Sequence, residues 1–188
     1  MKKFLAIAGA LMITSLATAA PPSKAENFSL NDYTGKKIAL TDFKDSKAIV
    51  LMFIATQCPV SNAYNERYNQ LYNDYKGKNI AVVAINSNKQ ESVDEIKDHA
   101  KEHNFEFPIL KDVNNVIADK FDAQRTPEIF LINPSTMEIL YHGRIDDSQR
   151  ESGIKSKDLR AALDEVLAGK PVSVKETKAF GCTIKRVN

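Results

Sequence analysis

Two cysteines, Cys58 and Cys182, are the residues of this chain best suited to chemistry. Cys58 stands in the stretch MFIATQCPVSNAY, where an apolar run ending at Ala55 gives way to a polar segment with helical spacing that begins near Pro59. The free backbone N–H groups and the dipole at a helix start stabilise an anion, which here is the thiolate. Because the thiolate attacks disulfides and peroxides, we expect Cys58 to be a redox nucleophile.

The partner of Cys58 is not fixed by the local sequence. Ser61 occupies the place of the second thiol in a C-x-x-C redox motif, and a hydroxyl cannot close a disulfide. The attacking sulfur must therefore be resolved by Cys182, by a second protein or by a small thiol, and pairing with Cys182 requires the C-terminal segment to fold back. Two plainer interpretations remain: a static Cys58–Cys182 disulfide, and a buried Cys58 that behaves as a small apolar residue.

A second candidate cluster is the tetrapeptide Arg125-Thr126-Pro127-Glu128. Pro127 directly precedes an apolar run, so it is either an ordinary strand start or the second residue of a cis Thr126–Pro127 peptide placed against the Cys58 sulfur. In the second case Arg125 would stabilise the thiolate and Glu128 would relay a proton. The plain alternative for both charges is solvation at the surface.

Three further groups of polar residues have weaker claims to a function. His99 and His103 lie four residues apart on an expected helix, a spacing that can hold a metal, but charged neighbours favour a solvated face. The run RIDD at residues 144–147 reads as an ion pair that fixes a loop, or as two carboxylates on a cation. His142 has no evident partner. We predict no metal site and no organic cofactor.

The hydrophobic pattern predicts alternating strands and helices after an opening hairpin. The hairpin turns at Thr34-Gly35, and Ser92 with Glu95 forms a capping box at the start of a helix. A hairpin near the end of the pattern makes the central sheet mixed, so the fold class is an α/β sandwich. The expected strands lie in residues 27–43, 47–55, 80–86, 107–110 and 128–143, and the expected helices in residues 60–76, 92–103, 114–123 and 156–169.

The first twenty residues resemble a secretory signal. Lys2 and Lys3 precede an apolar run at residues 4–16 and then small residues, so we expect a signal peptide at residues 1–20 with cleavage between positions 19 and 25. A retained N-terminal anchor is the alternative. The mature protein would be periplasmic or secreted, without a membrane span, with one domain at residues 26–169 and a C-terminal extension at 170–188.

The charge balance argues against a nucleic-acid partner. Lys2 and Lys3 account for the whole formal net charge of +2, so the expected mature chain carries equal numbers of acidic and basic residues. Binding to a phosphate backbone requires a clustered basic face, so a nucleic-acid partner has little support from this balance.

Six ordered segments of the chain resemble the redoxin branch of the thioredoxin fold. They are CPVSNAY, VVAINSN, TPEIF, RIDD, DLRAALDEVLAGKPV and FGCTIK, which together span residues 58–185. Within that branch the chain is similar to exported peroxiredoxin-like proteins related to alkyl hydroperoxide reductase and thiol-specific antioxidant, over residues 28–186. The resemblance implies a thioredoxin-like three-layer sandwich with an N-terminal β-hairpin and a C-terminal extension.

Carried over position by position, the resemblance implies Cys58 as nucleophile, Pro127 as the cis-proline and Cys182 as the C-terminal cysteine. One departure concerns peroxide chemistry, because Ala55 and Leu51 stand where true peroxiredoxins have a hydroxyl residue and a proline. Thr56 is one position out of register. This departure argues against efficient peroxide reduction.

The sequence thus predicts an exported thiol-disulfide oxidoreductase that acts through Cys58. Its substrate would be a protein disulfide or a peroxide, and its electron donor a thiol protein or a small-molecule thiol. A thiol peroxidase is the first alternative. A non-catalytic module that binds a client or copper(I) is the second.

Overall fold

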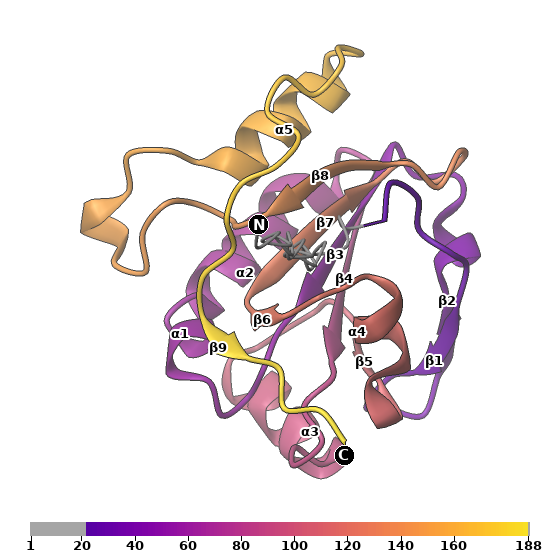
Figure 1. The fold of residues 1–188 in the computed structure, drawn as a ribbon, viewed down its shortest axis with the longest axis vertical. Coiled ribbons are helices and arrows are strands. Elements are labelled where there is room, and N and C mark those ends of the chain that lie inside the picture. Colours follow the sequence, from indigo (N-terminus) through magenta and orange to yellow (C-terminus); the bar gives the residue numbers. More distant parts are fainter. Residues whose placement is uncertain (1–21, 188) are drawn as a thin grey trace, which may run out of the picture.

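A five-stranded sheet in the strand order β5-β4-β3-β7-β8 forms the centre of the molecule (Figure 1). The structure is a computed structural model that describes residues 22–187, so the expected signal peptide lies outside the described residues. The strands are β1 (Ser29–Asn31), β2 (Lys37–Ala39), β3 (Ala48–Phe53), β4 (Ile80–Asn86), β5 (Ile109–Lys111), β6 (Arg125–Thr126), β7 (Glu128–Ile132), β8 (Ile139–Gly143) and β9 (Cys182–Thr183).

The central sheet is mixed, as the sequence predicts. Strands β3, β4 and β5 are parallel, while β7 pairs antiparallel with both β3 and β8. Every residue of β3 and of β7 is buried, which is why β3 and the part of β7 after Glu128 are unbroken apolar runs rather than alternating patterns. The opening hairpin pairs β1 with β2 and forms a separate two-stranded sheet.

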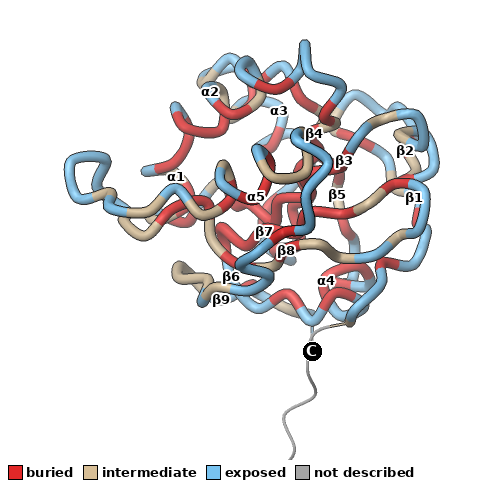
Figure 2. The backbone as a smooth tube through the Cα atoms, turned by 90° about the horizontal axis from the view of Figure 1, so that it is seen from above, coloured by how far each residue is buried: buried red, intermediate tan, exposed pale blue. Residues whose placement is uncertain are grey.

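Helices and the hairpin cover the two faces of the sheet and complete a three-layer sandwich. Apolar residues of α2, α3 and α5 pack on one face, whereas α4 and the β1–β2 hairpin pack on the other. Figure 2 shows the resulting buried centre in red, beneath a shell of exposed loops. The helices are α1 (Pro59–Asn62), α2 (Asn65–Lys76), α3 (Val93–Glu102), α4 (Val116–Lys120) and α5 (Asp158–Leu167), with 3-10 turns at Leu40–Phe43, Val113–Asn115 and Glu151–Gly153.

The helix expected at residues 60–76 is interrupted after one turn. The amide of Tyr64 bonds the carbonyl of Ser61, three residues back, which is a tighter turn than the α-helix makes. The carbonyl oxygen of Ala63 accepts a hydrogen bond from the guanidinium of Arg67 at 3.2 Å. The chain therefore ends α1 at Asn62 and starts α2 at Asn65, so Cys58 precedes a single helical turn.

After α5 the chain runs back across the molecule as a segment that we call the strap, residues 170–187. Its only regular element is β9, which pairs with β6. Lys175 and Thr177 exchange backbone hydrogen bonds with His142 of β8 at 2.9 and 3.0 Å. The strap continues past Arg125 to Lys89, whose amide donates to the carbonyl of Lys185 at 2.8 Å.

No helix within residues 22–187 is long and apolar enough to cross a bilayer.

Candidate redox site

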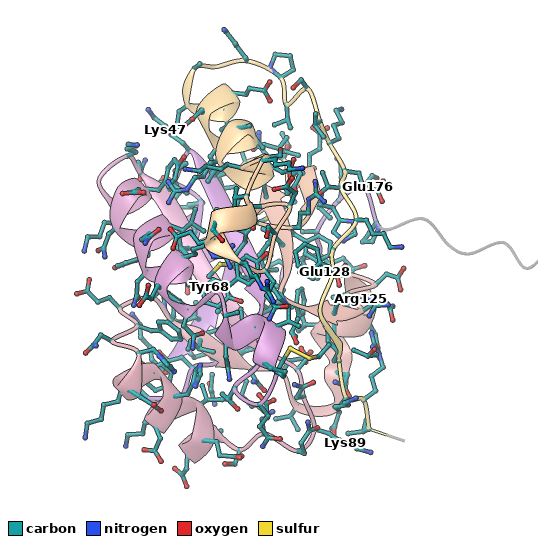
Figure 3. All side chains as sticks on the ribbon, turned by 90° about the vertical axis from the view of Figure 1, so that its left-hand side faces the viewer. Lys47, Tyr68, Lys89, Arg125, Glu128 and Glu176 are labelled. Carbon is teal, nitrogen blue, oxygen red and sulfur yellow. A yellow bond between two sulfur atoms is a disulfide. The ribbon has the colours of Figure 1, made fainter. Side chains whose placement is uncertain are left out.

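The structure joins Cys58 and Cys182 in a disulfide between the start of α1 and the strap (Figure 3). Their Cα atoms are 6.0 Å apart, within the usual range for disulfides. Cys58 is only 4% exposed, whereas Cys182 is partly exposed. In the oxidised protein the strap therefore covers the sulfur of Cys58.

Two backbone groups contact the sulfur of Cys58. The amide of Ser61 donates a hydrogen bond to Sγ at 3.3 Å. The carbonyl oxygen of Thr126 is also 3.3 Å from Sγ. In the reduced protein the Ser61 amide would stabilise the thiolate, and the thiol form would donate to the Thr126 carbonyl. Because α1 is only one turn long, the stabilisation expected from the dipole of a full-length helix is reduced, and the direct contact with the Ser61 amide matters more.

The peptide bond between Thr126 and Pro127 is cis, as predicted, and it lies beside the disulfide. Thr126 belongs to β6, and it is the register partner of Cys182 in β9. The cis-proline loop is thus the surface on which the strap lies. No sequence pattern predicted this pair of two-residue strands, because β9 has neither the length nor the alternation of a typical strand.

Arg125 and Glu128 contact the strap and the loop rather than a reacting group. The guanidinium of Arg125 donates to the carbonyl of Gly181 at 3.1 Å. Glu128 is buried, and its Oε2 accepts the amides of Gln124 and Arg125 at 2.7 and 2.8 Å. Its Oε1 lies 2.7 Å from Nε2 of His142, so His142 does have a partner. These contacts fix the cis-proline loop, and the suggested thiolate and proton-relay roles of the two charges stay predictions.

Comparison with known proteins places this geometry in a family. The pattern of the AhpC/TSA family matches residues 21–147. The chain belongs to the AhpC/TSA family. Among curated relatives, thiol-disulfide oxidoreductase ResA of Bacillus subtilis (strain 168) is 34% identical over 113 residues, which cover 60% of this chain and 61% of the relative. The match therefore spans less than two thirds of that relative's length.

Two solved structures show how far the likeness extends along the chain. A hypothetical protein of Sinorhizobium meliloti 1021 is 34% identical, with a TM-score of 0.83 over 90% of this chain and 96% of that one. The thioredoxin domain of a thiol-disulfide oxidoreductase from Bacteroides vulgatus is 18% identical, with a TM-score of 0.56 over 65% of this chain and 87% of that one. The second likeness concerns the fold alone, and the fold is thioredoxin-like.

Glu91 is the site residue that the sequence analysis missed. It is 1% exposed, and its carboxylate accepts the backbone amides of Thr56 and Gln57 at 2.7 and 3.2 Å. The side-chain amides of Asn86 and Asn88 donate to the same carboxylate. Glu91 therefore fixes the two residues before Cys58. Its position in a polar stretch between a strand and a helix gave no signal, because such stretches are usually solvated loops.

The Glu91 network reaches the strap through Asn88. The Asn88 Oδ1 accepts the amide of Lys185 at 2.7 Å, while its Nδ2 donates to Glu91. Lys111 completes the network by donating to the Asn88 carbonyl at 2.7 Å and to Asn86. Burial lowers the pKa of Lys111, and the nearby charge of Glu91 opposes that shift. One set of buried polar contacts thus joins the loop before Cys58 to the end of the strap.

Ser61, in the place of a second thiol, has structural contacts. Its hydroxyl accepts the amide of Ala55 at 3.1 Å and lies 3.2 Å from the hydroxyl of Tyr68. Burial raises the pKa of Tyr68, so this phenol stays protonated at neutral pH. Ser61 ties the end of β3 to α2 and, through its amide, contacts the Cys58 sulfur.

The remaining candidate groups pair within the protein. The rings of His99 and His103 are 4.4 Å apart and pack near Phe105, and burial lowers the pKa of His99. Within residues 22–187, no group of three His, Cys, Asp or Glu residues could hold a metal. The RIDD run makes ion pairs, as the plainer interpretation held, but with distant partners. They are Arg67 with Asp146 and Arg144 with Asp158, each at 2.7 Å.

Replacing Gly181 with alanine should weaken the internal disulfide. Gly181 has φ +149, and a Cβ there would overlap the carbonyl oxygen of Thr126 and lie 2.8 Å from its carbonyl carbon. The strap would have to move away from β6, taking Cys182 with it. We expect the equilibrium constant for disulfide formation in glutathione buffers to fall about tenfold or more, which corresponds to about 1.4 kcal/mol.

The matched control for this variant is Gly35→Ala. Gly35 also has a positive φ, +89, but no atom lies within 4 Å of its would-be Cβ. It therefore tests backbone strain without the overlap. Equal disulfide equilibria in Gly181→Ala and the wild type would show that the close approach at Thr126 is not needed.

Proposed function

We propose that the protein is an exported thiol-disulfide oxidoreductase that attacks with Cys58 and resolves with Cys182. The observation that carries this proposal is the Cys58–Cys182 pair lying against the cis-Pro127 loop. The Cys58 thiolate attacks one sulfur of a substrate disulfide, and the substrate's other sulfur leaves as a thiolate. The Cys182 thiolate then attacks Sγ of Cys58 and displaces the first substrate sulfur. Two electrons pass to the substrate, and the protein ends as the internal disulfide.

Regeneration needs a thiol donor, either a protein or a small molecule, outside the cytoplasm. The exposure of the two cysteines favours attack on Cys182, because Cys58 is 4% exposed and Cys182 is partly open. Cys58 then departs as a thiolate, which the Ser61 amide stabilises at 3.3 Å. A second thiolate of the donor breaks its mixed disulfide with Cys182, so both cysteines return to the reduced form. A stabilised leaving group accelerates thiol-disulfide exchange.

The family match makes a thiol peroxidase the second candidate. In that reaction the Cys58 thiolate takes an oxygen from a peroxide to give a sulfenic acid, which Cys182 converts to the same disulfide with loss of water. Two features favour disulfide substrates. Ala55 is an apolar residue where a peroxide-holding hydroxyl is expected, and the Ala55 amide is already bonded to Ser61. A static disulfide and a copper(I)- or client-binding module are the non-catalytic alternatives.

Intact-mass analysis of the full mature chain separates these candidates. The reduced protein is mixed with one equivalent of oxidised glutathione or of hydrogen peroxide, and free thiols are trapped at intervals. We expect glutathione disulfide to produce a transient adduct at Cys58 and then the internal disulfide, faster than peroxide does. Faster oxidation by peroxide would favour the peroxidase. Inertness toward both oxidants would show that Cys58 is not a reactive thiolate and would contradict the proposal.

Export is supported by the signal-like pattern at residues 1–20. The residues that follow take part in the fold, because the carbonyl of Ser23 accepts the amide of Ile139 at 3.0 Å. The amide of Ala25 donates to the carbonyl of Met137 at 2.8 Å. These bonds favour cleavage ahead of Ser23, within the interval predicted from the sequence.

A further inference from the structure

We propose that residues 180–184 of the strap, Phe-Gly-Cys-Thr-Ile, are a built-in copy of the substrate chain. The substrate would then be an extended polypeptide whose reactive cysteine follows a glycine, with an aromatic residue before the glycine and an apolar residue two positions after the cysteine. This inference rests on the proposed function and names the substrate class of the same site.

Backbone pairing supplies the first argument. In the described part of the chain, β6 pairs with β9 alone, so its hydrogen-bonding edge is available to whatever chain lies there. The strap uses this edge in antiparallel register, with Thr126 opposite Cys182, and the amide of Ile184 donates to the carbonyl of Gln124 at 2.9 Å. These bonds involve the main chain only, so another extended chain can make them equally well.

Two side chains of the strap anchor it on either side of the disulfide. The ring of Phe180 packs against the ring of Tyr64, with centroids 6.4 Å apart. Ile184 is 3% exposed and belongs to the apolar cluster on the α4 face of the sheet. An aromatic anchor and an aliphatic anchor, spaced four residues apart, give the groove its side-chain specificity beyond the backbone bonds.

Gly181 occupies the position of the strap at which the groove restricts the residue type most strictly. A side chain at this position would overlap the carbonyl oxygen of Thr126, and the φ of +149 is one that other residues rarely adopt. Arg125 holds the same residue through its carbonyl oxygen. A client chain that presents its cysteine to Cys58 in this register therefore needs glycine directly before the cysteine.

The chemistry follows from exchange between the strap and the client. Reduction of the Cys58–Cys182 bond removes the covalent link, and a client can then occupy the groove. Cys58 attacks the client sulfur, the client's disulfide partner leaves as a thiolate, and a mixed disulfide forms. When the strap returns, the Cys182 thiolate attacks Cys58 and expels the reduced client cysteine. Resolution and product release are then the same event.

Synthetic peptides with the strap sequence test the inference. The peptide KAFGCTIKR, with its cysteine linked to 5-thio-2-nitrobenzoate, is mixed with reduced full-chain Cys182→Ser protein, and release of the coloured thiolate gives the rate. The comparison peptides are KAFACTIKR, KAAGCTIKR and KAFTCGIKR, the last with the same composition but with glycine after the cysteine. We expect KAFGCTIKR to react at least about tenfold faster than KAFACTIKR, in which alanine replaces the glycine, and than the rearranged KAFTCGIKR.

The outcomes separate this inference from the proposed function. Equal rates for all peptides would overturn the substrate class while leaving Cys58 as a reactive thiolate. No reaction with any peptide, nor with 5,5′-dithiobis(2-nitrobenzoate), would overturn both. The reduced wild type provides a check that does not depend on the variant, because it should release the coloured thiolate and then free peptide, ending as the internal disulfide.

Discussion

Cys58→Ser should abolish reaction with disulfides, whereas Cys182→Ser should stop the reaction at its midpoint. In the proposed reaction Cys58 makes the first bond to the substrate, and Cys182, the second of the two cysteines in the chain, takes no part in that step. Cys182 acts only afterwards, when it attacks Cys58. The Cys182→Ser protein should therefore accumulate a stable mixed disulfide through Cys58, which intact mass measured under non-reducing conditions will show as one adduct per chain.

The two single variants control for each other. Both lack the internal disulfide, and therefore both lose the stabilisation of about 5 kcal/mol that closing so long a loop provides in the chain-entropy account. A difference in reactivity between them cannot come from loss of the disulfide alone. If Cys58→Ser formed the adduct and Cys182→Ser did not, the assignment of nucleophile and resolving thiol would be reversed.

Glu91→Ala should be the most damaging substitution among the residues that do not react. The carboxylate accepts four hydrogen bonds, two from the backbone just before Cys58 and two from asparagine side chains. Removing it leaves buried donors without partners and takes away the opposite charge that acts most strongly on Lys111. We expect the free energy of unfolding to fall by about 3–5 kcal/mol in urea titrations of the oxidised protein.

Glu95→Ala is the matched control for this variant. Glu95 also contacts Gln57, through its side chain at 2.9 Å, and it lies near Glu91 in the sequence, but it is exposed. Glu95→Ala should therefore lower the free energy of unfolding much less than Glu91→Ala does.

Reaction of the reduced Glu91→Ala protein with oxidised glutathione should also slow, because the Thr56-Gln57 loop no longer holds Cys58. Unchanged stability and rate would show that Glu91 does not position the site.

The elements that follow simple periodicity could be predicted from the sequence. The run IAVVAIN is β4 with the expected bounds, because a strand buried on both faces is a continuous apolar run. Ser92 and Glu95 form the expected capping box at α3. The hairpin turns at Thr34-Gly35 and pairs β1 with β2, where Gly35 has the positive φ that the turn requires. Each of these features depends on residues that are close in sequence.

The features that depend on distant residues could not be predicted from the sequence. The helix interruption after Asn62 involves Arg67, whose guanidinium is held by Asp146 far along the chain. His142 and Glu128 meet across two strands. The carboxylate of Glu91, which is buried, binds the backbone amides of Thr56 and Gln57, 35 and 34 residues earlier in the chain. Periodicity cannot reveal such contacts, since it reports which face of an element is apolar and not which polar groups meet.

The candidate site also contains features that could be predicted from local sequence and one that could not. Cys58 at a helix start and the cis Thr126–Pro127 bond follow from local sequence and from family resemblance, and the structure contains both. The pairing of Cys58 with Cys182 was one alternative among several. Only the three-dimensional structure selects this pairing, because the two sulfurs can meet only when the strap lies along β6.

The sequence separation of 124 residues between the linked cysteines makes most of the molecule a closed covalent ring. The exposed stretch around Gln149, Arg150 and Glu151 lies inside that ring. A protease that cuts there would produce two fragments still tied together through sulfur, which would migrate as one species until a reductant opened the link. Cleavage at this stretch would thus leave the mobility of the oxidised protein nearly unchanged, and the two fragments would separate only after reduction of the disulfide.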